Sequence, residues 1–152
     1  MRHEGGCACG GVRFAVDGEL APVVACHCES CRRWSGYYWA AIEIPRERFT
    51  LTESATLAGW ASSPDVLRQF CRVCGASLFF DDRAAAHIEI APGAFDQPTG
   101  QTTIAHIYCA EAGDYYPIDR AARRYADAEP SDGIDEPTAR DRGHPDRSPP
   151  AS

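Results

Sequence analysis

Seven of the eight cysteines in this 152-residue chain fall into three short clusters, and these clusters constrain the fold more than any other feature. The clusters are Cys7-Ala8-Cys9-Gly10-Gly11, Cys26-His27-Cys28-Glu29-Ser30-Cys31 and Cys71-Arg72-Val73-Cys74-Gly75. Cysteines two or three residues apart in a tight turn can direct both sulfurs to one metal ion, and a following glycine relieves the strained backbone. The sequence therefore predicts metal sites that hold distant segments together.

The first and third clusters are natural partners, because each is a two-sulfur turn with a glycine directly after it. Two such pairs complete a tetrahedral four-cysteine site of the structural zinc type. We expect Cys7, Cys9, Cys71 and Cys74 to form that site and to close a loop of about sixty residues. The alternative is two redox pairs or free buried thiols.

The middle cluster places three thiolates, Cys26, Cys28 and Cys31, within six residues. Three protein ligands leave a fourth zinc position for water or substrate, which distinguishes catalytic from structural zinc. Alternatively His27, His106 or Cys109 closes the site. We expect His27 to point away, because neighbours in an extended segment face opposite sides. Cys109, on a predicted strand, is expected to be a core residue.

Arg32, Arg33 and Trp34 follow the third thiolate directly. Two arginines beside an open zinc site can hold the carboxylates of an acidic thiol compound, so these three residues are candidate substrate contacts. The alternative is that Trp34 belongs to the core and the arginines form a solvated rim.

Short alternating apolar runs predict a mainly β domain over residues 1–126. Val12, Phe14 and Val16 alternate with polar or small residues, and the other predicted strands are Pro22–Ala25, Tyr37–Ile44, Phe49–Thr52, Val66–Phe70, Leu78–Phe80, His87–Ile90 and Thr103–Tyr108. A short helix is predicted at Asp119–Tyr125. Residues 127–152 are rich in charge, proline and glycine, which predicts a disordered tail.

Composition narrows the function classes. No run of eighteen apolar residues is present and the N-terminal residues lack an apolar signal region, so we expect a cytoplasmic protein without a membrane segment. In a reducing compartment, eight cysteines indicate metal or catalysis more than disulfides. The net charge of −7 implies no basic face, so nucleic acid is not expected as a partner. The oligomeric state stays open.

Three motifs in order resemble the glutathione-dependent formaldehyde-activating enzyme family, which includes centromere protein V-like domains. The motifs are Gly6–Phe14, Cys26–Arg33 and Arg68–Leu78, with weaker similarity at Gly93–Asp96 and from His106–Tyr108 to Tyr115–Asp119. The resemblance covers about residues 5–126. It implies a β-tent-like domain stapled by two zinc ions per chain, a structural one at Cys7, Cys9, Cys71 and Cys74 and a catalytic one at Cys26, Cys28 and Cys31.

The resemblance also implies a carbon–sulfur lyase that condenses formaldehyde with glutathione to S-hydroxymethylglutathione. Small thiol and aldehyde substrates are then the expected partners, with glutathione as co-substrate. Two alternatives remain: a thiol-binding module without turnover, and a protein-interaction module in which both zinc ions are structural.

Overall fold

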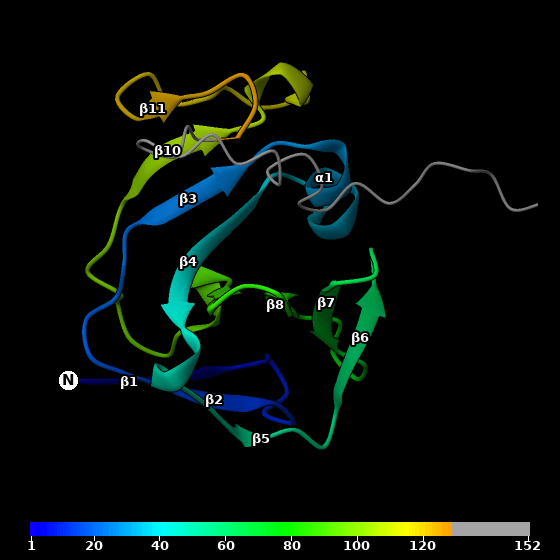
Figure 1. Cartoon of the computed structure of the whole chain (residues 1–152), viewed down its shortest axis with the longest axis vertical. Coiled ribbons are helices and arrows are strands. Elements are labelled where there is room, and N and C mark those ends of the chain that lie inside the picture. Colours follow the sequence, from blue (N-terminus) through cyan, green and yellow to red (C-terminus); the bar gives the residue numbers. More distant parts are fainter. Residues whose placement is uncertain (129–152) are drawn as a thin grey trace, which may run out of the picture.

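The computed structural model describes residues 1–128, which form two β-sheets and one short α-helix (Figure 1). The strands are β1 (Arg2–Gly6), β2 (Arg13–Asp17), β3 (Val23–Cys26), β4 (Trp39–Pro45), β5 (Phe49–Glu53), β6 (Leu57–Ala61), β7 (Val66–Cys71), β8 (Ser77–Asp82), β9 (His87–Ile90), β10 (Thr103–Ile107) and β11 (Arg123–Arg124). The helix is α1 (Glu29–Ser35), and the short 3-10 helices are η1 (Arg46–Arg48), η2 (Pro92–Ala94) and η3 (Cys109–Glu111). The mainly β prediction is confirmed.

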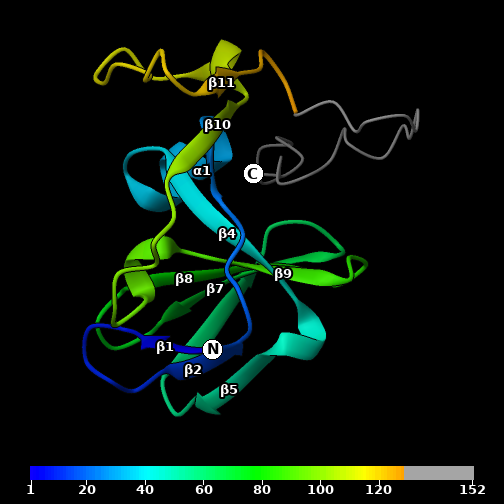
Figure 2. The ribbon, with the colours of Figure 1, turned by 90° about the vertical axis from the view of Figure 1, so that its left-hand side faces the viewer.

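The smaller sheet has the strand order β1-β2-β5, and the larger has the order β11-β10-β3-β4-β9-β8-β7-β6. Strand β10 pairs in parallel with β3 and with β11, whereas the other pairs are antiparallel. Figure 2 shows β10 and β11 at the end of the molecule farthest from β1 and β2, with α1 beside β4 at that end. The two ends carry different cysteine clusters.

The main hydrophobic core lies between the two sheets. Phe14 of β2 packs edge-on against Phe79 of β8, with ring centroids 5.5 Å apart, and both side chains are almost fully buried. Ile42 and Ile90, which are paired between β4 and β9, complete this layer. Phe14 and Val16 of β2, and Val12 just before it, all belong to this core, as the alternating sequence pattern predicts.

A second cluster of buried residues lies at the helical end of the larger sheet. It contains Cys28 and Cys31 with Trp39, Val66 and Phe80. The middle cysteine cluster is thus part of a core of its own, away from the layer between the sheets.

Strands β1 and β6, like the two-residue β11, were not predicted, because their sequences carry no alternating apolar pattern. Strand β1 is Arg-His-Glu-Gly-Gly and forms by pairing along its whole length with β2. Strand β6 pairs with β7, and its last three residues are exposed. Helix α1 was not predicted either, because its seven residues are too few to show a helical apolar stripe.

The helix predicted at Asp119–Tyr125 is wrong. That segment contains turns and the short strand β11, which pairs in parallel with β10. The Asp119 Oδ1 atom accepts a hydrogen bond from the Ala121 backbone N–H, a local turn that competes with helix formation. Cys109, predicted on a strand, lies instead in η3, because β10 ends at Ile107 and Tyr108 adopts a left-handed backbone with φ of 54°.

The predicted tail, residues 127–152, lies outside the described residues except for Asp127 and Ala128. The Asp127 carbonyl accepts a hydrogen bond of 2.8 Å from the Tyr108 N–H, so backbone pairing reaches one residue beyond the expected boundary at 126. Within residues 1–128, no helix has the length and apolar character needed to cross a bilayer.

Candidate metal centres

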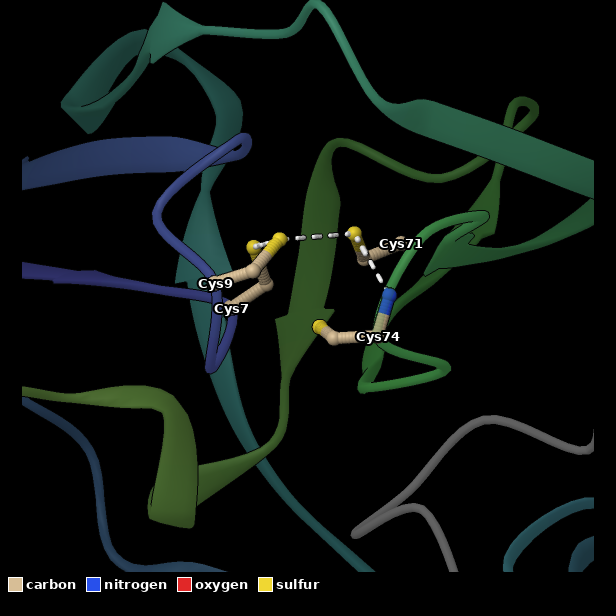
Figure 3. Close-up of side chains that lie close together, drawn as sticks. All are labelled: Cys7, Cys9, Cys71 and Cys74. Carbon is tan, nitrogen blue, oxygen red and sulfur yellow. Dashed lines mark hydrogen bonds between the residues drawn. The ribbon is translucent and has the colours of Figure 1, made fainter.

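Four cysteines from two hairpin turns meet at the end of the molecule that carries the smaller sheet (Figure 3). Cys7 and Cys9 lie in the turn between β1 and β2, while Cys71 ends β7 and Cys74 lies in the turn to β8. The Sγ atom of Cys9 lies 3.6 Å from the Sγ atom of Cys7 and 3.6 Å from that of Cys71. All four sulfurs lie within 4.8 Å of one another. The structure brings together the two pairs that the sequence suggests as partners.

The backbone of both turns favours thiolates at this site. The Val12 N–H donates to the Cys7 Sγ at 3.2 Å, and the Cys74 N–H donates to the Cys71 Sγ at 3.5 Å. Gly10 and Gly75 adopt left-handed backbones with φ of 82° and 77°, which lets each turn close. A hydrogen bond from the Thr56 hydroxyl lowers the pKa of the Cys71 thiol to about 5. Four close sulfurs, one of them easily ionised, suit a soft divalent metal.

The second group of sulfurs belongs to Cys26, Cys28 and Cys31, which again lie within 4.8 Å of one another. Cys26 is the last residue of β3, Cys28 is the N-cap of α1, and Cys31 lies in the first turn of that helix. The Cys28 side chain accepts a hydrogen bond from the Cys31 N–H at 3.4 Å. A strand end and a helix cap therefore place three sulfurs at one point.

Ionisation in this group is concentrated on one sulfur. Hydrogen bonds from the side chains of Cys26 and Cys31 lower the pKa of the Cys28 thiol to about 2, and the same contact with Cys28 raises the pKa of Cys26. Cys28 and Cys31 are only 1% and 4% exposed, while Cys26 is half-buried. One thiolate flanked by two thiols gives three sulfur ligands, which match the ligand chemistry of zinc.

None of the candidate fourth ligands joins this sulfur group among residues 1–128. His27 is fully buried and faces away from it, as strand alternation predicts: its Nδ1 lies 2.8 Å from the Tyr116 hydroxyl and its Nε2 lies 2.8 Å from the His106 Nδ1. Burial lowers the pKa of His27 to about 4. Cys109 is half-buried, and its thiol donates to the His106 carbonyl at 3.5 Å.

Arg68, which the sequence reasoning missed, lies against the three-cysteine group. Its Nη1 and Nη2 atoms are 3.7 and 3.9 Å from the Cys31 Sγ, and its side chain is 1% exposed. Strand alternation could have predicted the burial of Arg68, since Arg68 lies on the same face of β7 as the buried Val66.

Arg32 and Arg33 line a shallow surface hollow of about 280 Å³ together with Glu29 and Tyr115. The Arg33 Nε donates to the Glu29 Oε1 at 2.9 Å, and the Arg32 Nε donates to the His27 carbonyl at 3.3 Å. Trp34 does not line this hollow. Its ring stacks on Trp60, with centroids 6.1 Å apart, and contacts Phe70 edge-on. The structure therefore separates Trp34 from the two arginines.

A profile of the family described as glutathione-dependent formaldehyde-activating enzyme matches residues 2–111, which include both cysteine groups and Arg68. The chain belongs to this family. The formaldehyde-activating enzyme match ends within η3, so β11 lies beyond it.

One curated relative and one solved structure of similar fold extend the comparison. An uncharacterized lyase of Schizosaccharomyces pombe is 31% identical over 78 residues, which is 51% of this chain and 56% of that protein. The chain thus spans little more than half the length of this curated relative. The crystal structure of a Rhodobacter sphaeroides protein is similar with a TM-score of 0.53 and 22% identity, covering 61% of this chain and 87% of the other. This second likeness concerns the fold alone.

Proposed function

We propose that this protein is a zinc-dependent carbon–sulfur lyase that joins a small thiol, glutathione or a similar compound, to formaldehyde or another aldehyde. The observation that carries the proposal is the group of three sulfurs, Cys26, Cys28 and Cys31, at the start of the helix whose Arg32 and Arg33 line a surface hollow. Membership of the glutathione-dependent formaldehyde-activating enzyme family and similarity to a protein named a lyase support the same reaction class. The four-cysteine group takes the structural zinc ion, which gives two ions per chain.

Zinc at the three-cysteine group would supply an activated thiolate at neutral pH. The thiolate sulfur would attack the carbonyl carbon to form a carbon–sulfur bond, while the electron pair of the carbonyl π bond moves to the oxygen, which takes up the proton that the thiol released. The reverse reaction breaks the carbon–sulfur bond and returns the aldehyde and the thiol. Thiol addition to formaldehyde needs only modest acceleration, so much of the effect comes from orienting the two reactants.

Two arginines support the choice of an acidic thiol as substrate. Arg32 and Arg33 line the hollow next to the helix that carries Cys31, and guanidinium groups bind carboxylates through paired hydrogen bonds. Glu29 holds Arg33 in place from the preceding helical turn. We also propose a reducing compartment, the cytoplasm, since the eight cysteines are free thiols that suit metal binding.

Turnover is tested by exchange NMR, because the adduct also forms without an enzyme. The wild-type protein, with about two zinc ions per chain by elemental analysis, should accelerate exchange between formaldehyde, glutathione and their adduct above the rate in buffer. Cys28→Ser should remove the acceleration, whereas Cys109→Ser, outside the sulfur group, should keep it. A wild-type rate equal to that of buffer, with both zinc ions bound, would rule out the lyase activity for this substrate pair and leave a thiol-binding or scaffold role.

A further inference from the structure

Arg68 is a buried cation in an unusual environment. Its side chain is 1% exposed and contacts Cys31 and Phe80, two members of the small core at the helical end of the larger sheet. The guanidinium carbon lies 4.9 Å from the centroid of the Phe80 ring and 6.0 Å from that of Trp34. Aromatic faces attract a cation, but they do not neutralise it.

A buried charge is costly unless it meets an opposite charge. Within residues 1–128, no carboxylate forms an ion pair with Arg68, and its Nε has no hydrogen-bond partner. Its two terminal nitrogens instead converge on the Cys31 Sγ, at 3.7 and 3.9 Å. The sulfur group is therefore the anion that Arg68 faces.

With zinc bound, the three-cysteine group would carry a single negative charge, which the single positive charge of Arg68 balances. Three thiolates around one divalent zinc ion carry a net charge of −1, which disfavours a fourth, anionic sulfur. We propose that Arg68 is the internal counter-charge of the three-cysteine centre, a positioning residue that acts through Cys31 and allows the centre to accept a substrate thiolate. This inference rests on the proposed function, since it presupposes a metal ion at these three cysteines.

Arg68 and the surface arginines would then have separate tasks. Arg32 and Arg33 line the hollow and can reach the carboxylates of a bound molecule, whereas a side chain that is 1% exposed cannot. The effect of Arg68 should therefore depend on the charge of the incoming ligand atom and not on the rest of the ligand. This dependence separates an electrostatic role from a purely structural one.

The test uses full-length protein loaded with Co²⁺, whose absorption spectrum reports the ligands at each site. Two ligands are titrated: 2-mercaptoethanol, which binds as a thiolate and has no carboxylate, and imidazole, which binds as a neutral molecule. The variants are Arg68→Gln, which keeps hydrogen-bond donors without charge, and Arg68→Lys, which keeps the charge. Arg83→Gln is the control, because among residues 1–128 the side chain of this exposed arginine donates to the carbonyls of Pro64 and Asp65 and to no other group.

We expect Arg68→Gln to weaken 2-mercaptoethanol binding roughly tenfold or more, given Coulomb interactions at an effective dielectric constant near 20. Imidazole binding should stay within about twofold, and Arg68→Lys and Arg83→Gln should resemble wild type. Equal losses for both ligands, or no loss for the thiol, would overturn the counter-charge role. The number of cobalt ions bound per chain is measured before the titrations. If the wild-type chain binds one ion and not two, the proposed function itself is refuted.

A measurement on the wild type covers the case in which Arg68→Gln does not fold. In cadmium-loaded protein, NMR detects scalar coupling between the metal and guanidinium protons across a hydrogen bond to a ligand sulfur. Coupling from the Arg68 protons through Cys31 is the expected result. A spectrum in which the Arg68 guanidinium is assigned and shows neither coupling nor a shift on thiol addition would contradict the proposal.

Discussion

At the scale of single residues, the three-cysteine group is supported by side chains that are not ligands. His27 lies between two of the cysteines in sequence, yet its ring bonds to Tyr116 and His106 and fixes the segment that ends β3. The Tyr116 hydroxyl also accepts a hydrogen bond from the Gly113 N–H at 3.2 Å. The chain after β10 is thereby tied to the cysteine cluster.

Tyr116→Phe should lower the free energy of unfolding by about 1–2 kcal/mol, because it leaves a buried His27 nitrogen and the Gly113 N–H without their partner. Urea denaturation measures this loss. Tyr115→Phe is the matched control: Tyr115 is 52% exposed, so its variant should be close to wild type. Equal effects in the two variants would show that the hydroxyl network contributes nothing specific.

The two surface arginines should affect acidic thiols selectively. Replacing Arg32 and Arg33 together by Ala should weaken glutathione binding by about 2–4 kcal/mol, from the strength of charged hydrogen bonds reduced by solvent exposure. Binding of 2-mercaptoethanol, which has no carboxylate, should not change. Calorimetric titration of both thiols separates the outcomes, and a parallel loss for the two thiols would place the arginines in the fold and not in substrate binding.

At the scale of elements, the two cysteine groups differ in what they connect. The four-cysteine group joins the β1–β2 turn to the β7–β8 turn, so it links the two sheets. The three-cysteine group joins the end of β3 to the helix that follows it directly. Loss of metal should therefore cost the fold much more at the first group than at the second.

Cys74→Ser should lower stability by several kcal/mol, because metal binding between distant segments is part of the folding free energy. Against a typical domain stability of about 5–15 kcal/mol, such a loss is enough to give insoluble or molten protein. Cys28→Ser should keep the fold and lose one metal ion. Thermal melting with elemental analysis checks both, and equal melting losses would contradict the division between a structural and a substrate-binding centre.

At the scale of the whole molecule, backbone pairing among residues 1–128 extends past residue 126, the domain boundary that the composition predicts. The carbonyls of Ala126 and Asp127 accept hydrogen bonds from the N–H groups of Ala110 and Tyr108. These bonds hold the chain after β11 against η3. We therefore expect the folded domain to need residues 127 and 128 in addition to residues 1–126.

Truncation after Ala128 should leave the melting temperature and metal content unchanged, since residues 129–152 are rich in charge and proline and poor in apolar side chains. Truncation after Tyr125 should cost about 1–2 kcal/mol, because it removes two backbone acceptors. Calorimetry of the two truncated chains makes the comparison. A loss in the longer chain equal to that in the shorter one would mean that residues 129–152 contribute to stability.

The sequence by itself determined the features that depend on local spacing. Cysteines two or three residues apart predict the two sulfur groups, and alternation predicts β2, β4 and β9, because both patterns follow from the geometry of a short stretch of backbone. The side chains that surround the three-cysteine group, in contrast, are brought there by the tertiary structure. Arg68 is 37 positions from Cys31, and His27 is 79 from His106, so only strand pairing brings them together.

The dependence on tertiary structure also explains which sequence predictions were missing or wrong. Strand β1 exists because β2 offers it a partner, and β11 because β10 does, so neither needs a pattern of its own. Trp34 and Arg33 are neighbours in sequence, but successive helical residues point in different directions, which sends one to Trp60 and the other to the hollow. Ligand spacing is a local property, whereas charge balance and burial around the ligands belong to the assembled sheet, and only the tertiary structure decided them.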